Sequence, residues 1–145
     1  MTPKTLFLAL AMVWAVPLFA ANTPAIPALG PVPADFVKGA DISTLPELEK
    51  LGVKFYNADN QLQDPIAILK ANGINTLRLR LWVDPYDASG KAYGGGTNDL
   101  PTTLALAKRA KAAGMQILLD FHYSDFWTDP GKQFKPKAWE KLTFP

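Results

Sequence analysis

Residues 74–83 read INTLRLRLWV and have the pattern of a β-strand. The stretch is rich in β-formers, and side chains alternate between the two faces of a strand. Arg78, Arg80 and Trp82 therefore share one face, while aliphatic side chains occupy the other. Two arginines on one face are unusual inside a sheet, so the architecture depends on what those arginines meet.

A second stretch, residues 115–122 (MQILLDFH), repeats this alternation, with Asp120 and His122 together on one face. In an open parallel sheet covered by helices on both sides, central strands are almost continuously apolar. The inside of a (β/α) barrel differs, because it accepts charged side chains near the carboxyl ends of its strands. There the two arginines would face Asp120 and His122, and the charges on the two strands would compensate each other. The pattern favours an α/β fold of the (β/α)8 barrel type.

The segments between these strands carry the start and stop signals of helices. Thr44 and Glu47 have the spacing of a reciprocal capping box. Residues 36–40 form a short apolar run that ends at Asp41, which predicts a first strand. Strands and helices alternating at about 40-residue spacing predict βα units around a parallel sheet. One expected helix opens at Thr44 and stops at Gly52, and a second opens at Asp64 and stops at Asn72-Gly73. The third runs from Pro101 to Ala113, with Gly114 capping its end.

Composition excludes several classes of protein. The 145 residues include 15 Lys and Arg against 13 Asp and Glu, which leaves no electrostatic footprint for nucleic acid or an anionic membrane. The absence of cysteine excludes disulfides, Cys-ligated zinc and thiol catalysis. The single histidine, His122, leaves no spacing for a multi-histidine metal site. We expect a folded domain with no nucleic-acid partner, no metal site and no cofactor in this chain.

The N-terminal residues have the features of an export signal. Residues 1–20 contain Lys4, an apolar run from Leu6 to Val16, and a small residue at Ala20. The apolar run is shorter than the roughly 20 residues that a membrane-spanning helix needs, so no membrane anchor is expected. Residues 21–35 are rich in proline and are interpreted as a linker. The protein is expected to be secreted or periplasmic, with its domain at residues 36–145.

The charged strand faces contain the first candidate site. Arg80, Asp120 and His122 form either a structural ion-pair network or a polar cluster that holds hydroxyls and orients a carboxylate. His122 stands at the carboxyl end of its strand and is followed by a loop, which favours a site. Both interpretations stay open at this point.

Residues 123–130 (YSDFWTDP) form a loop that mixes three aromatic residues with carboxylates. Aromatic faces stack on sugar rings and carboxylates accept hydrogen bonds from hydroxyls, so this composition suits carbohydrate; the alternative is a loop that only covers the top of the barrel. Residues 94–96 (GGG) lack the Lys-Ser/Thr of a phosphate-binding loop and are interpreted as a flexible turn. Lys108, Arg109 and Lys111 are expected to form a solvated helix face.

Several motifs occur in a characteristic order between residues 36 and 145. They are residues 38–43 (KGADIS), 54–56 (KFY), 77–85 (LRLRLWVDP), 94–100 (GGGTNDL), 105–115 and, most specifically, 118–133 (LLDFHYSDFWTDPGKQ). Together they closely resemble glycoside hydrolase family 53, the endo-β-1,4-galactanases or arabinogalactan endo-β-1,4-galactosidases. The resemblance covers residues 36 to 145 and is specific to the bacterial branch, which has the longer glycine-containing loop.

The resemblance implies a (β/α)8 barrel that cleaves β-1,4-linked galactan with retention of configuration, using two glutamates after strands four and seven. A complete barrel takes about 250 residues, so the chain is expected to be an N-terminal part with three βα units. Both catalytic glutamates would then lie beyond Pro145. Glu47, Glu49 and Glu140 match neither catalytic position, and no catalytic residue is assigned within the chain.

The resemblance also implies roles for residues of the site. Arg80 matches the arginine that supports the nucleophile, and His122 matches a histidine that lines the site near the cleaved bond. The calcium site of bacterial members lies in a late loop outside this chain, and the full-length protein is expected to be a monomer acting on a polysaccharide. The residues that match motif positions of the site wall or sugar platform are Trp82, Asp120, Asp125 and Trp127.

Two rival functions stay open. A non-catalytic galactan-binding or scaffold protein would keep the aromatic loop and lack the catalytic half. A secreted glycosidase of a related barrel family would act on another glycan. An Asn-Glu pair after a fourth strand would favour the galactanase over the binding protein.

Overall fold

A computed structural model describes residues 30–33 and 35–143. The residues from Pro33 onward form one compact unit. The expected export signal at residues 1–20 and most of the expected linker at residues 21–35 lie outside the described residues. Within the described part of the chain, no helix is both long enough and apolar enough to cross a membrane.

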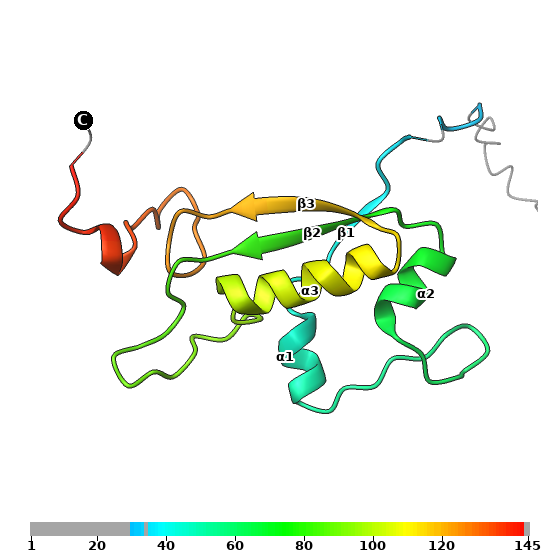
Figure 1. The fold of residues 1–145 in the computed structure, drawn as a ribbon, viewed down its shortest axis with the longest axis horizontal. Helices are drawn as coiled ribbons and strands as arrows, with labels where there is room; N and C mark the ends of the chain where they lie inside the picture. The colour runs from blue at the N-terminus through cyan, green and yellow to red at the C-terminus, as the bar shows by residue number, and fades with distance from the viewer. Residues whose placement is uncertain (1–29, 34, 144–145) are drawn as a thin grey trace, which may run out of the picture. The chain divides into compact units, whose positions relative to one another are not determined.

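Three parallel strands form the centre of this unit, in the order β1-β2-β3 (Figure 1). The expected parallel sheet and its βα order are confirmed. The register of the strands places Asp41 beside Arg78, and Arg80 beside Asp120. Because the strands are parallel, the loops that follow β2 and β3 emerge at the same end of the sheet. The strands are β1 at Gly39–Asp41, β2 at Thr76–Leu81 and β3 at Gln116–Phe121.

The helices begin and end near the expected residues. Asp64 caps the second helix by accepting from the backbone N–H of Ile66 at 2.7 Å, and Asp99 caps the third by accepting from Thr102 N at 2.9 Å. The capping box expected at Thr44 is wrong, because that residue makes no side-chain cap hydrogen bond. The helices are α1 at Leu45–Lys50, α2 at Pro65–Ala71, α3 at Leu100–Ala112 and a short 3-10 turn, η1, at Lys137–Trp139.

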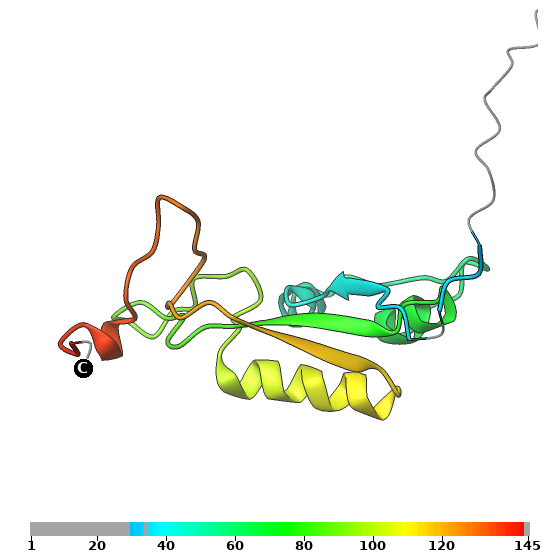
Figure 2. The ribbon, with the colours of Figure 1, turned by 90° about the horizontal axis from the view of Figure 1, so that it is seen from above.

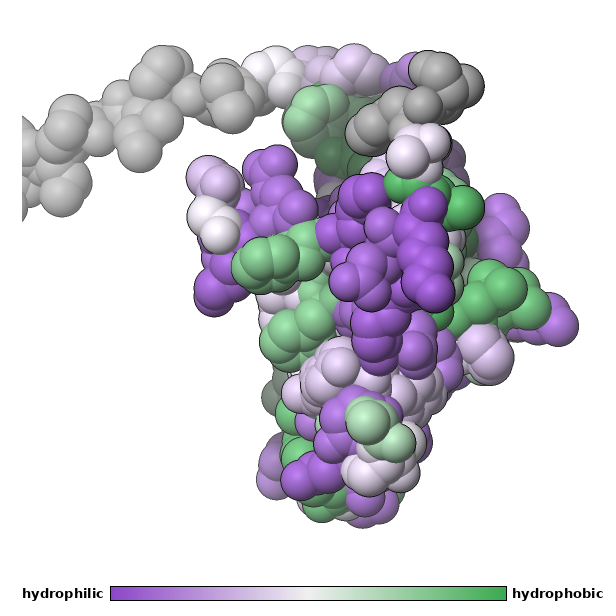
Figure 3. Space-filling view, turned by 90° about the vertical axis from the view of Figure 1, so that its left-hand side faces the viewer, coloured by the Kyte–Doolittle hydropathy of each residue, from purple (hydrophilic) through white to green (hydrophobic). Residues whose placement is uncertain are grey.

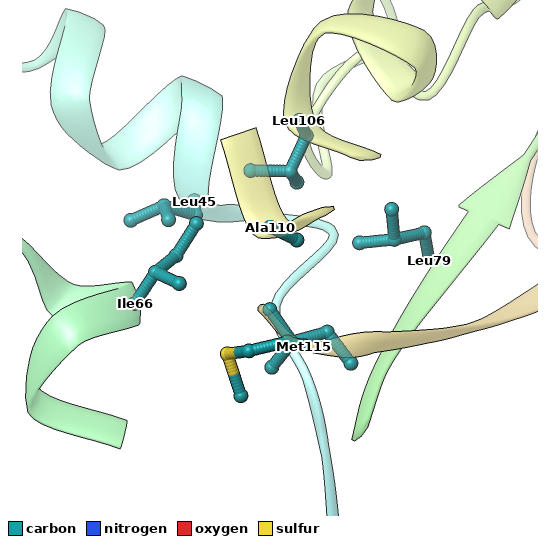
Figure 4. Close-up of a cluster of buried hydrophobic side chains, with 7 residues drawn as sticks. Leu45, Ile66, Leu79, Leu106, Ala110 and Met115 are labelled. Carbon is teal, nitrogen blue, oxygen red and sulfur yellow. The ribbon is translucent and has the colours of Figure 1, made fainter. Parts of the chain in front are cut away.

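The hydrophobic core lies between one face of the sheet and the helices. Leu77 and Leu79 of β2 belong to it, as the alternation of residues 74–83 predicts. Figure 4 shows Leu79 among the other side chains of the core. Figure 2 shows α3 lying along this face of β2 and β3. The charged side chains of the strands consequently occupy the opposite face. The other buried members of the core are Leu45, Ile66, Leu106, Ala110 and Met115.

The expectation of a solvated basic face on α3 is wrong at Arg109. Lys108 and Lys111 are exposed, as expected, but the guanidinium of Arg109 binds both carboxylate oxygens of Glu49, at 2.8 and 2.9 Å. It also donates to Asp64 at 2.7 Å. These bonds raise the pKa of Arg109 and keep it charged. A single arginine thus ties α3 to α1 and to the start of α2.

Candidate functional site

A chain of polar contacts crosses the charged face of the sheet. Arg78 of β2 forms ion pairs with Asp41 of β1 on one side and with Asp120 of β3 on the other. Asp120 contacts His122 Nε2 at 2.9 Å, and the indole N–H of Trp82 donates to His122 Nδ1 at 2.9 Å. Because Nδ1 accepts a hydrogen bond, the proton of this neutral imidazole resides on Nε2 and points to Asp120. The network fixes the histidine ring at the carboxyl end of β3.

Arg80 does not bind Asp120, although the backbone places the two residues side by side. Its Nη2 donates to the hydroxyl of Thr44 at 2.9 Å and lies 3.6 Å from Asp41. Its Cζ lies 4.0 Å from the centre of the Trp127 ring, a cation–π contact. The expected cluster of Arg80, Asp120 and His122 is therefore corrected, because Arg78 takes the place of Arg80 as the partner of Asp120.

Two donors of Arg80 have no acceptor. The residue is 4% exposed, and among the described residues Nε and Nη1 find no hydrogen-bond partner. Burial lowers the pKa of Arg80, and the negative charge of Asp41 opposes that shift. A buried donor left unpaired costs about 1–3 kcal/mol, so buried polar groups are normally paired. These two donors are available to an anionic or polar group.

Hydroxyl groups at the end of β1 hold Arg80 in place. Ser43 is buried, and its Oγ accepts from the backbone N–H of Arg80 at 2.9 Å. Burial alone would raise the pKa of Asp41, but hydrogen bonds from Ser43 and the charge of Arg80 lower it below its usual value. Sequence reasoning missed Ser43 and Thr44, because a hydroxyl next to a helix start has an ordinary capping role. No local signal points to a strand 36 residues away.

The glycine run is packed and is not the expected flexible turn. Gly94, Gly95 and Gly96 all have positive φ, as does the following residue, Thr97. A Cβ on Gly96 would overlap the carbonyl oxygen of Ser43. The backbone N–H of Gly96 donates a hydrogen bond to Glu47 Oε2 at 2.5 Å. Glycine is required here by both backbone conformation and space. Sequence spacing excluded a phosphate-binding role but did not reveal this packing.

Asp125 joins the loops that follow β2 and β3. One of its carboxylate oxygens accepts from the backbone N–H of Asp84 at 3.0 Å, and the other accepts from Lys137 N at 2.8 Å. Lys137 adds an ion pair to Asp84 at 2.9 Å. Asp125 thus holds the wall of the site by backbone contacts and has no oxygen left unbonded.

The tryptophans expected in the site differ in exposure. Trp82 is 1% exposed and contacts Phe126, with ring centres 4.9 Å apart, and Trp127 at 5.7 Å. Trp127 is 46% exposed and presents surface to solvent beside Arg80. Trp82 therefore supports the aromatic cluster from within, and Trp127 has a ring that a ligand can reach.

An open groove adjoins His122. It has a volume of about 470 Å³ and includes the exposed ring of Tyr123, whose backbone has a positive φ of 51°. Figure 3 views the molecule from the side at which β2 and β3 end, and shows hydrophilic residues in the middle with hydrophobic residues on both sides. The other lining residues are Thr128, Asp129, Pro130, Gln133, Phe134 and Lys135. Mixed aromatic and polar linings of this kind suit sugars.

The described residues contain no group of three or more His, Asp or Glu side chains arranged to hold a metal ion. Each carboxylate of the charged face is instead within an ion pair or a hydrogen bond. The chemistry that this face supplies is hydrogen bonding and positive charge at Arg80.

The sequence profile of glycosyl hydrolase family 53 matches residues 37–145. The chain belongs to this family, and the expected class of fold, part of a (β/α) barrel, is confirmed. It is 53% identical over 110 residues to the endo-β-1,4-galactanase of Bacillus subtilis, covering 76% of this chain and 26% of that protein. It is 46% identical over 102 residues to a probable arabinogalactan endo-β-1,4-galactanase A of Aspergillus fumigatus, covering 70% of this chain and 26% of that protein.

Solved structures of family 53 proteins also match the chain. The family 53 catalytic domain of Ignisphaera aggregans is 51% identical, with a TM-score of 0.75, and the match covers 77% of this chain and 31% of that domain. A fungal β-1,4-galactanase is 43% identical, with a TM-score of 0.63, over 71% of this chain and 29% of the other. The chain thus spans about a quarter to a third of the length of these relatives.

Proposed function

We propose that residues 36–145 form the first three βα units of a secreted or periplasmic enzyme that hydrolyses the β-1,4-galactosidic bonds of galactan in pectin side chains. The two catalytic glutamates of its retaining mechanism lie outside these residues. Membership of family 53 and the galactanase names of the relatives support this proposal. The working enzyme is a monomer without a membrane anchor.

The unpaired donors of Arg80 are the observation that carries the proposal. The N–H groups of a guanidinium lie in one plane, and each of them can donate to a carboxylate oxygen. In Arg80 the unpaired donors are Nε and Nη1, while Nη2 is already held by Thr44. A catalytic carboxylate that accepts from one of these donors is the proposed partner. The arginine then keeps that carboxylate ionised, because a neighbouring positive charge favours the charged form.

Retaining hydrolysis requires this ionised state. One carboxylate attacks the anomeric carbon while the other, about 5–5.5 Å away, protonates the leaving oxygen. The glutamates of this chain are engaged elsewhere, since Glu47 binds Gly96 and Glu49 binds Arg109. Glu140 lies exposed after η1. None of the three reaches Arg80.

The other site residues bind and orient the sugar. Both ring nitrogens of His122 are already bonded, to Asp120 and to Trp82, so His122 lines the site through contacts of its ring. Trp127 supplies an exposed platform for the apolar face of a galactose ring. Trp82, Asp120 and Asp125 act mainly by holding these groups in place.

A chimeric enzyme tests the proposal and needs no residues of this protein other than 36–145. Residues 36–145 replace the 110 residues that they match in the Bacillus subtilis endo-β-1,4-galactanase. We expect the purified chimera to release reducing sugar from β-1,4-galactan, with the unaltered Bacillus enzyme as the positive control. A folded chimera that binds galactan without cleaving it would favour the non-catalytic galactan-binding protein. Cleavage of another β-glycan in preference to galactan would favour the related glycosidase.

A further inference from the structure

We propose that Glu47 and the glycine loop, defined as residues 94–97, position Trp127 over the Arg80 guanidinium. This inference rests on the proposed function, because it assigns a positioning role in the same site. Glu47 belongs to α1 and touches neither Arg80 nor a sugar-binding surface. It acts through the loop that it holds.

The first step is the hold of Glu47 on the loop. Its Oε2 accepts from the backbone N–H of Gly96 at 2.5 Å, a charge-assisted hydrogen bond across 49 residues of chain. Its other oxygen would lie 3.4 Å from a Cβ on Gly94, so the carboxylate sits directly against the loop. Four consecutive residues with positive φ make this a conformation that outside contacts must hold.

The second step is the contact between the loop and the tryptophans. A Cβ on Gly95 would lie 3.1 Å from the indole nitrogen of Trp127 and 3.1 Å from the ring of Trp82. The Gly95 Cα thus faces both rings at a separation that leaves little room for a side chain. A shift of the loop toward the rings would displace Trp127, whose exposed side offers no opposing surface among the described residues.

The third step connects Trp127 to the reacting groups. The Trp127 ring faces Arg80 Cζ at 4.0 Å, so it covers the guanidinium whose unpaired donors await a carboxylate. Covering this charge excludes water and fixes the plane of the guanidinium. Arg80 is also held by Thr44, which directly precedes α1. Thr44 therefore bonds Arg80 directly, whereas Glu47 acts on it through the glycine loop and Trp127.

Substitution of Glu47 in the chimera tests this positioning role. Glu47→Ala removes the acceptor of Gly96 N, and kcat on galactan should fall by about tenfold or more, because small displacements of positioned groups cost such factors. Glu47→Gln keeps an acceptor oxygen and should recover most of the activity. Glu49→Ala is the matched control on the same helix, because its carboxylate pairs with Arg109 and not with the loop. It should leave kcat unchanged within about twofold while lowering stability.

A second pair of variants separates the contact from backbone strain. Gly95→Ala and Gly90→Ala both place alanine at positive φ, 68° and 81°, in the same connection between β2 and α3. A Cβ at Gly95 presses on Trp127, whereas a Cβ at Gly90 meets nothing within 4 Å. Gly95→Ala should lower kcat by about tenfold, and Gly90→Ala should leave it unchanged. This pair decides the inference if Glu47→Ala does not fold.

Near-ultraviolet circular dichroism supplies a readout independent of activity. The difference spectrum between the chimera and its Trp127→Phe variant defines the Trp127 band, which Glu47→Ala should weaken and Glu49→Ala should preserve. If the chimera does not cleave galactan, the proposed function fails while this spectrum still tests the positioning. The inference is overturned if Glu47→Ala matches Glu49→Ala in both kcat and spectrum, or if Gly95→Ala matches Gly90→Ala.

Discussion

Replacing Arg80 by lysine separates catalysis from stability. Lysine keeps the positive charge but loses the planar donor edge and the stacking on Trp127. Loss of the hydrogen bond to Thr44 costs about 1 kcal/mol, and loss of the cation–π contact costs about 1 kcal/mol more. A loss of about 2 kcal/mol leaves a protein of ordinary stability folded. The guanidinium donor proposed to bind the nucleophile is lost as well, so kcat should fall at least about tenfold, equivalent to about 1.4 kcal/mol.

The assay uses the galactanase chimera with and without Arg80→Lys. Initial rates on β-1,4-galactan give kcat, and urea unfolding gives the change in free energy of unfolding. A large fall in kcat with a modest fall in stability supports the catalytic role. Unchanged kcat with a large loss of stability would refute the reasoning and return Arg80, Asp120 and His122 to a structural ion-pair network.

Two further predictions concern the 145-residue chain itself, and a third concerns the galactanase chimera. It should release no reducing sugar from galactan, and measurable release by the purified chain would contradict the assignment of the glutamates. Leu118, Leu119 and Phe121 of β3 are exposed, so the chain should aggregate or melt without cooperativity; a sharp melt of a soluble monomer would count against this. Burial would raise the pKa of Asp64, but the hydrogen bond from Arg109 lowers it below its usual value. The stability that ionised Asp64 contributes to the fold is therefore present above about pH 4 and is lost as the pH falls below that value. In the folded chimera, Arg109→Met should lower the free energy of unfolding by about 1 kcal/mol at neutral pH and by less in acid. An equal loss at pH 3 and pH 7 would contradict this prediction.

The parallel sheet and its charged face could be predicted from the sequence because they rest on local rules. Alternation along residues 74–83 places the leucines in the core and the arginines opposite them, and main-chain geometry enforces that pattern. Helix boundaries at Asp64 and Gly114 follow from similarly local capping preferences. The resemblance to family 53 rests on a continuous motif and was therefore also visible.

The partners of the charged residues could not be predicted, because they depend on contacts between distant segments. Strand alternation cannot distinguish Arg78 from Arg80 as the partner of Asp120, since both point to the same face. Arg109 has the spacing of a solvated residue, yet its acceptors lie 60 and 45 residues away. The glycine run had the composition of a flexible turn, whereas its packing against Ser43 arises only in the folded chain.

The most direct measurement of the central claim is a crystal structure of the galactanase chimera. The account predicts that Arg80 Nε or Nη1 lies about 2.7–2.9 Å from an oxygen of a glutamate carboxylate, the spacing of a charge-assisted hydrogen bond. That glutamate should lose the ability to cleave galactan when it is changed to glutamine. Nε and Nη1 bonded only to water or to backbone carbonyls, in a chimera that still cleaves galactan, would contradict the account.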